Sequence, residues 1–170
     1  ASGRNAGFIL QGTAERYSRA IGVMGRERAR RVHSWSRDNH IAMAEAVRRF
    51  GIDCAYQQRG SLQLAASAGE EVELLESAAR LHEDGFTAHV WSGSDLPACY
   101  RDAGFSVGVH LPDDGELHPA RFVRGLADAA VASGAELHEA TDTVRIDAQG
   151  AGDVTVHTTG PGGRGSVRAS

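Results

Sequence analysis

Small and polar residues crowd the first eight positions of this 170-residue chain. The segment places the hydroxyl of Ser2, the guanidinium of Arg4 and the carboxamide of Asn5 among glycines and alanines: Ala1-Ser2-Gly3-Arg4-Asn5-Ala6-Gly7-Phe8. Backbone amides and an arginine just ahead of a helix are groups that bind phosphate, and a carboxamide suits the polar edge of a ring. The same composition is also typical of a frayed chain end. The residues alone therefore leave open both an anion-binding loop and an ordinary terminus.

Two glycine-containing segments match the consensus sequences of functional motifs. Residues 160–165 fit G-x-G-x-x-G, but that dinucleotide loop must lead into a helix, and the few residues that follow include Val167, which favours strands. We therefore interpret this motif as a hairpin loop. Residues 104–108 fit G-x-S-x-G, yet Ser106 falls inside an alternating strand that ends at Pro112, which disfavours a hydrolase nucleophile.

Histidines and carboxylates gather in two places. Five potential metal ligands occur within nine residues, without a second cluster at ligand spacing, so a solvated turn before a helix is expected: His110, Asp113, Asp114, Glu116 and His118. His33 and His40 lie seven residues apart on a helix and are expected to form a pair on its surface, since no third ligand is near.

Composition excludes several function classes. Every one of the 18 basic residues is arginine, so a P-loop, a pyridoxal Schiff base and a kinase-type phosphate clamp, which each need lysine, are excluded. The net charge of −4 argues against nucleic acid as the main partner. No apolar run is long enough for a membrane span, no secretory signal is visible, and Cys54 and Cys99 form no disulfide pattern, so a cytoplasmic setting is expected.

Periodicity predicts helices and strands that alternate along the chain. We expect helices from Thr13 to Gly25, up to Gly51, from Ser67 to Gly85, after Ser94, and from Pro119 to Gly134. Strands are expected at 54–56 and 62–66, paired through a turn at Arg59-Gly60, and then at 87–91, 105–111, 136–138, 143–148, 154–158 and after 165. Together they predict an α+β fold.

Apolar spacing also predicts which helix faces point inward. The faces are expected to be Val32, Trp35, Met43, Ala46, Val47 and Phe50 in the second helix; Val72, Leu75, Ala79 and Leu81 in the third; and Phe122, Val123, Leu126, Ala130 and Val131 in the last. Arginines line the other face of the long helix, with Trp35 the one aromatic among them. A non-catalytic module that binds a partner through this basic helix, residues 26–50, therefore stays an alternative function.

The first eight residues resemble the A-S-G-R-N-A/G-G segment of FAD-dependent amine and amino-acid oxidoreductases, the D-amino-acid oxidase superfamily that includes glycine, sarcosine and gamma-glutamylputrescine oxidases. Further segments agree in order with that family: residues 60–64, 90–91, 115–119, 134–137 and 143–146. The resemblance implies that residues 1–52 and 116–170 belong to a FAD-binding domain, and that residues 53–115 belong to an inserted substrate domain of antiparallel sheet and helices.

Residue roles follow from the same resemblance. Flavin contacts are implied for Ser2, Gly3, Arg4, Asn5 and Gly7, and the backbone of Val144 is expected to meet the adenine of FAD. The strand-glycine-helix motif with which such enzymes begin is not in the chain, and their later strands are not either. The chain is therefore expected to be an internal stretch that depends on the N- and C-terminal segments of a longer enzyme.

The implied reaction is oxidation of the C–N bond of a small amine or amino acid, with hydride passing to the flavin. Tyr56, Gln58 and Arg59, around the expected hairpin, are the substrate-side candidates, because an arginine fork suits a substrate carboxylate. An exposed turn without function is the other interpretation of these three residues. The sequence singles out no catalytic base and no metal site.

Overall fold

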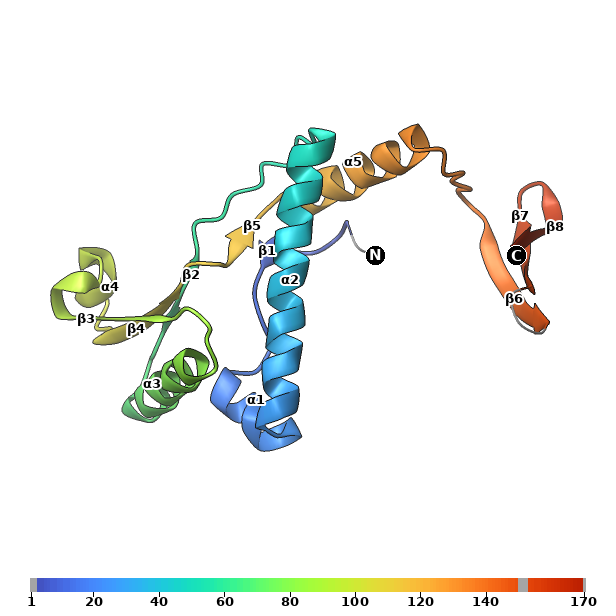
Figure 1. Cartoon of the computed structure of the whole chain (residues 1–170). Helices are drawn as coiled ribbons and strands as arrows, with labels where there is room; N and C mark the ends of the chain where they lie inside the picture. The colour runs from blue at the N-terminus through green and yellow to red at the C-terminus, as the bar shows by residue number, and fades with distance from the viewer. Residues whose placement is uncertain (1–2, 150–152, 170) are drawn as a thin grey trace. The chain divides into compact units, whose positions relative to one another are not determined.

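The computed structural model describes residues 3–149 and 153–169 of the chain (Figure 1). It divides into two compact units, one up to Asp128 and one from Ala129 onward. The elements are β1 Phe8–Ile9, α1 Tyr17–Met24, α2 Arg26–Phe50, β2 Ser61–Leu64, α3 Ala68–Glu83, β3 His89–Ser92, a 3-10 turn Gly93–Asp95, α4 Ala98–Asp102, β4 Val107–Leu111, β5 Gly115–Glu116, α5 Pro119–Ala132, β6 Asp142–Gln149, β7 Asp153–Gly160 and β8 Gly163–Ala169. Helices and antiparallel sheets are mixed, which confirms the α+β class.

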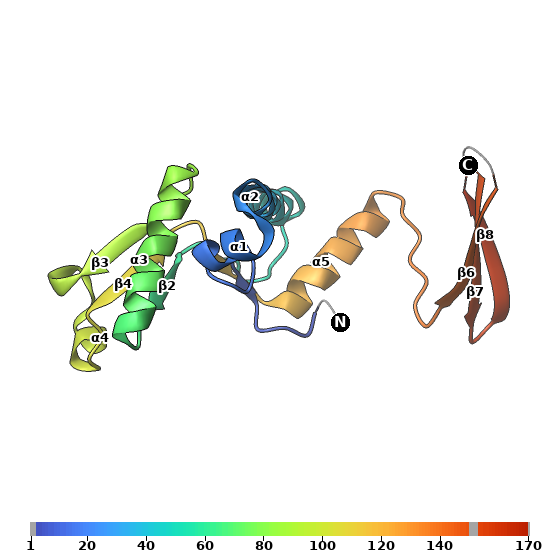
Figure 2. The ribbon, with the colours of Figure 1, turned by 90° about the horizontal axis from the view of Figure 1, so that it is seen from below.

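The first unit contains an antiparallel sheet of three strands in the order β2-β4-β3, with α3 packed on one face (Figure 2). Val107 and Val109 of β4 point toward α3, where they meet Leu74 and Ala78. Ser67 begins α3 as predicted, since its Oγ accepts a hydrogen bond from the Glu70 amide. Alternation along β4 therefore buries one side of the sheet under the helix.

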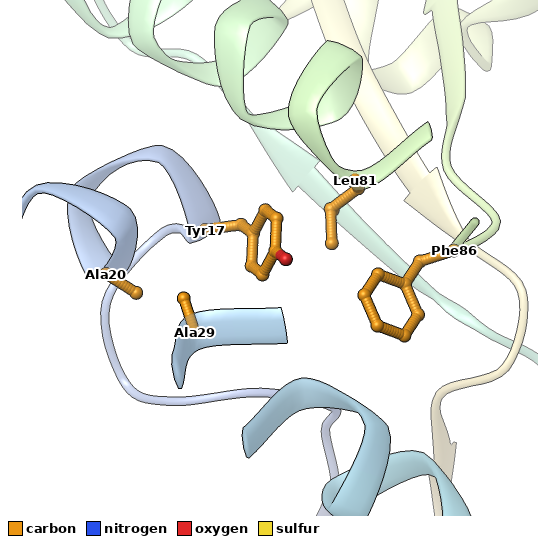
Figure 3. Packing of buried hydrophobic residues seen from close by; sticks show 5 residues of the cluster. All are labelled: Tyr17, Ala20, Ala29, Leu81 and Phe86. Carbon is orange, nitrogen blue, oxygen red and sulfur yellow. The ribbon is translucent and has the colours of Figure 1, made fainter. Parts of the chain in front are cut away.

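A second cluster joins α1, α2 and the end of α3. Tyr17 and Ala20 of α1, Ala29 of α2, Leu81 of α3 and Phe86 pack together in the unit's interior (Figure 3). The Tyr17 hydroxyl donates a hydrogen bond of 2.7 Å to Asp84 Oδ2, so the buried ring keeps a partner for its polar end.

All five expected helices form, although α1 begins at Tyr17 rather than Thr13. The inward faces predicted for α2 and α3 are correct only in part, at Met43, Val47, Leu75 and Leu81. Both α2 histidines are buried, His33 at 6% and His40 at 8% exposure, whereas Trp35 is 62% exposed. His33 and His40 share one side of α2 with the buried Ala29. This side of the helix, and not the side of Trp35, therefore faces the neighbouring elements. In α3, Val72 is 68% exposed, since Leu74, Ala78 and Leu81 form the buried stripe.

The predicted hairpin before β2 is also wrong. Strand β2 pairs with β4 instead, with Leu62 opposite His110. The segment before it is extended but joins β5 through a bridge between Gln57 and Glu116. Cys54 is fully buried in a cluster with Ile9, Ile52 and Leu117. Residues 54–56 therefore pack in this cluster and do not pair with β2.

Two further boundaries differ from the expectation. Residues 8–9, which are in none of the expected strands, form β1 and pair with β5 in antiparallel register, Phe8 opposite Glu116. Helix α5 has the predicted start at Pro119, but none of its residues is fully buried; its Phe122 and Leu126 pack partly against the cluster around Cys54. Val123 and Val131, predicted to point inward, are 37% and 53% exposed.

The second unit is a three-stranded antiparallel sheet, β6-β7-β8. Gly160 pairs with Gly163 across the tight turn between β7 and β8, and β8 follows directly. The glycine motif is therefore a hairpin, as predicted, and within the described residues it leads into strand β8. Residues 136–138 form no strand, which corrects that prediction. No helix in the described part of the chain has the length and apolarity needed to cross a membrane.

Candidate functional site

A fixed turn holds residues 3–7 of the N-terminal loop against the start of α5. The Asn5 side-chain oxygen accepts a hydrogen bond of 2.8 Å from the Gly7 amide, and the Gly7 carbonyl accepts one of 2.9 Å from the Leu117 amide. Gly7 has φ +80°, and a methyl group there would collide with the Leu117 carbonyl oxygen. A Cβ on Gly3 would lie 3.4 Å from Cα of Ala120, in the first turn of α5. The loop is therefore ordered in a conformation that only glycine permits at position 7.

The loop presents one cation. Arg4 is exposed, and it forms no ion pair with any residue in 3–149 or 153–169. Its neighbour Gly3 lies against the first turn of α5, and both a helix N-terminus and an unpaired guanidinium favour an anionic ligand. A pyrophosphate fits this donor set. Ser2, the remaining predicted residue of the loop, lies outside the described residues.

Strand β1 leads from this loop into a cavity of about 370 Å³ that contains Arg59. Phe8 and Leu10 line it from the β1 segment, and Leu62 lines it from β2. Phe8 is 67% and Leu10 55% exposed, so these apolar side chains face the opening rather than the core. Besides Arg59, the charged group in the lining is Glu116. The cavity thus combines an apolar wall with one guanidinium and one carboxylate.

The other two substrate candidates lie elsewhere. Residues 56–59 are extended, so alternate side chains point to opposite sides. Tyr56 and Gln58 line a different cavity, beside His40 of α2, and share none of the lining around Arg59. Burial raises the pKa of the half-buried Tyr56 hydroxyl, and the neighbouring Cys54 adds to the effect. The structure therefore separates Arg59 from the two residues with which it was grouped.

Asp114 fixes the backbone beside Arg59, a role that its sequence position did not reveal. Asp114 is 1% exposed, and its carboxylate accepts hydrogen bonds from the Gln11 backbone amide, at 2.9 Å, and from Ser61 Oγ, at 2.6 Å. Its carbonyl accepts a third bond from the Gly60 amide, at 2.9 Å. The expected solvated turn is thus a buried anchor that ties three segments together. No cluster of metal ligands occurs among residues 3–149 and 153–169.

Val144 lies in the second unit, at an irregularity of the β6–β7 ladder. Thr143 pairs with Thr158 and Arg145 with His157, so Val144 is the extra residue of a β-bulge. The extra residue of a bulge is left out of the ladder, and its backbone groups are therefore available to another partner. Such a residue suits the expected backbone contact with a purine edge, whatever its side chain.

The buried histidine His33 has no visible part in this chemistry. Burial lowers its pKa to about 4, and the charge of Arg37 adds to the shift. Its ring packs against Tyr17 and Phe86, with centroids 5.3 and 4.2 Å away. His33 is therefore a neutral core residue and not the surface residue predicted. Ser106 likewise precedes β4 and donates a hydrogen bond to Glu71, away from any strand-to-helix turn.

Comparison with known proteins gives one consistent result. Residues 1–169 match the family described as DAO, FAD dependent oxidoreductase. Two relatives are named probable oxidoreductase OrdL: the Haemophilus influenzae protein is 25% identical over 85% of this chain and 34% of its own length, and the Rhizobium meliloti protein 27% identical over 94% and 37%. The chain thus spans little more than a third of the length of these relatives.

Solved structures agree on the fold. Glycine oxidase from Geobacillus kaustophilus superposes with a TM-score of 0.68 at 22% identity, over 96% of this chain and 42% of that protein. L-Amino acid deaminase from Proteus myxofaciens superposes with a TM-score of 0.71 at 17% identity, over 96% and 35%. Since the family match extends over nearly the whole chain, the chain belongs to the FAD dependent oxidoreductases of the DAO family.

Proposed function

We propose that this chain is part of an enzyme that oxidises the C–N bond of an amine or amino acid, with FAD as the hydride acceptor. The observation that carries the proposal is the continuity between loop 3–7 and the cavity of Arg59, because Phe8 and Leu10 follow the loop directly and line that cavity. A cofactor held by the loop would therefore lie next to a space for a small substrate. The names of the structural neighbours, glycine oxidase and L-amino acid deaminase, support an amino acid as substrate.

The chain's own residues would hold the cofactor through its phosphates and its adenine. In this proposal Ser2, Gly3, Arg4, Asn5 and Gly7 contact the flavin part and its pyrophosphate, and the Val144 backbone contacts the adenine. Support comes from the unpaired Arg4, the glycine turn at position 7 and the bulge at Val144. When bound, FAD supplies the redox chemistry that the amino-acid side chains lack.

Arg59 would bind the substrate carboxylate in two parallel hydrogen bonds, which fixes the orientation of the α-carbon. The apolar side chains of Phe8, Leu10 and Leu62 would contact the apolar part of the substrate. Tyr56 and Gln58 stay predicted substrate contacts, although their side chains line another cavity.

The remaining segments of the enzyme are proposed partners of this chain. Relatives and neighbours are two to three times longer than the matched region. Helix α5 leaves Val123 and Val131 exposed, and apolar helix positions of this kind are normally covered in a complete domain. We therefore expect other segments of the same polypeptide to pack on α5.

Absorbance of the complete protein tests the proposal. A purified yellow protein with a band near about 450 nm, bleached anaerobically by an amino acid or amine, is the expected result because flavin reduction is visible. A colourless protein that binds an acidic macromolecule would overturn it. That result would favour the alternative module built on the basic helix at 26–50, where exposed Trp35 lies under Arg31 at 5.6 Å.

A further inference from the structure

Flat rings gather on the face of the β2-β4-β3 sheet that points away from α3. Val109 of β4 packs toward α3, so its neighbour His110 points to the opposite face. The register places His89 of β3 opposite His110, and Trp91 follows two residues later on the same face. The rings of Trp91 and His110 stack with centroids 4.6 Å and planes 21° apart, and those of His89 and His110 at 6.2 Å and 19°. We call these three residues the ring stack: His89, Trp91 and His110.

The ring stack adjoins the cavity of Arg59. A Cβ on Gly60, which lines that cavity, would collide with Nε2 of His110, so the missing side chain leaves room for the imidazole. Leu62 lines the same cavity and lies opposite His110 in the ladder between β2 and β4. The wall of the cavity therefore continues onto the face of the sheet that carries the ring stack.

Gly108 joins the leucines of β2 to the indole of β3. It pairs with Trp91, and a Cβ there would lie 3.0 Å from Cδ1 of Leu62 and 3.1 Å from Cδ2 of Leu64. Because Gly108 has no side chain, both leucines close over it. Leu62, Leu64 and Trp91 are each half-buried, so part of every side chain stays accessible to a ligand. The result is an apolar surface that extends from the Arg59 cavity to the indole.

We propose that the ring stack binds a flat aromatic group of the substrate whose carboxylate Arg59 holds. This inference rests on the proposed function and narrows its amine to one that also carries an aryl group. An aromatic ring gains from stacking on Trp91 and His110 beyond the apolar area that it buries, whereas a saturated ring of the same size gains from the area alone. The ring stack thus determines specificity, because Arg59 fixes one end of the ligand and the two rings select the other.

Calorimetric titration of the complete holoenzyme with three carboxylates tests the proposal: phenylpropanoate, cyclohexylpropanoate and propanoate. None of them has an amine to be oxidised, so the binding constants do not depend on turnover. Phenylpropanoate should bind at least about threefold more tightly than cyclohexylpropanoate, which is the fold-change that stacking adds to burial of a ring. It should bind at least about tenfold more tightly than propanoate, which has no ring to bury.

Matched variants locate the ring. Trp91→Leu should abolish the preference for phenyl over cyclohexyl, and Trp91→Phe should keep it, since a phenyl side chain still stacks. His110→Gln removes the second ring and should reduce the same preference, which provides a test if the leucine variant does not fold. Trp35→Leu, at an exposed tryptophan of α2, is the control and should leave all three binding constants unchanged. Arg59→Gln should weaken the binding of all three carboxylates.

Three results would overturn the ring stack as a binding surface. Cyclohexylpropanoate could bind as tightly as phenylpropanoate, which would mean an apolar wall without stacking. A phenyl preference could survive both Trp91→Leu and His110→Gln, which would mean that the ring binds elsewhere, or none of the three carboxylates could bind. Bleaching of the flavin by amines separates these results from failure of the proposed function. A protein that is bleached but has no phenyl preference contradicts the ring stack alone, whereas a phenyl preference that depends on Trp91, in a protein that no amine bleaches, contradicts the oxidation alone.

Discussion

Replacing Asp114 should destabilise the protein more than any neighbouring change in the same turn. Its carboxylate accepts one hydrogen bond from the Ser61 hydroxyl and one from the Gln11 backbone amide, and the residue is almost completely buried. Hydrogen bonds to a charged group contribute about 1.5–3 kcal/mol each, so Asp114→Ala should cost about 3–6 kcal/mol in the free energy of unfolding. Asp114→Asn keeps one acceptor oxygen and should cost about 1–2 kcal/mol.

Urea unfolding of the holoenzyme measures these differences, provided that the slope of the transition is unchanged. Asp113→Ala is the matched control, because the Asp113 side chain makes no hydrogen bond or ion pair within the described residues, and its carbonyl, which faces His40, is kept. We expect a loss below about 1 kcal/mol for that control, as for other surface substitutions. Equal losses at positions 113 and 114, or an alanine variant within about 0.5 kcal/mol of the unmodified protein, would refute the anchor role of Asp114.

Three other changes test the loop, the buried histidine and the substrate cavity. Gly7→Ala should weaken FAD binding by more than about tenfold, measured by equilibrium dialysis, because φ +80° and the Leu117 carbonyl exclude a side chain; Gly162→Ala, where a Cβ meets nothing within 4 Å, should not. His33 has a folded-state pKa of about 4, below the unfolded value of 6.5, so the unfolded state binds the proton first. Stability should be full above about pH 6.5 and fall by up to about 3 kcal/mol toward pH 4, and His33→Gln should flatten that part of the urea profile. Arg59→Gln should raise KM for a carboxylate-bearing substrate about tenfold or more but leave an amine without a carboxylate unaffected, whereas Arg124→Gln on α5 should change neither.

Local signals in the sequence were sufficient for the helices. Gly51 ends α2 in the left-handed conformation, and Ser67 begins α3 with the predicted cap, because both effects act within one turn of the helix. Pro119 likewise marks the start of α5. These elements could be predicted because the residues that decide them are adjacent in the chain.

Strand pairing and burial could not be predicted in the same way. Whether residues 54–56 pair with β2 depends on Glu116, which lies about sixty positions later and bridges Gln57 instead. The buried face of α2 depends on which elements lie beside it. The polar character of His33 and His40 therefore led to the wrong prediction that both lie on the surface. Asp114 has the composition of a turn residue, and only the fold brings Gln11 and Ser61 to it. Contacts between distant segments decide each of these cases.

The site shows the same division between chemistry and placement. From their types alone, residues 1–8 allowed either an anion-binding loop or an ordinary terminus, and Arg59 allowed either a carboxylate contact or an exposed turn. The proposal that the two act together depends on the two-residue strand β1, which the sequence did not predict. The residues of this segment, Phe8 and Leu10, follow the loop directly and line the Arg59 cavity. The same extended backbone turns Tyr56 and Gln58 to the opposite side, where they line a separate cavity beside His40. A one-residue alternation along residues 56–59 thus separates Arg59 from Tyr56 and Gln58, so that a substitution at Arg59 should act on the cavity of the proposed oxidation and leave the lining of the other cavity unchanged.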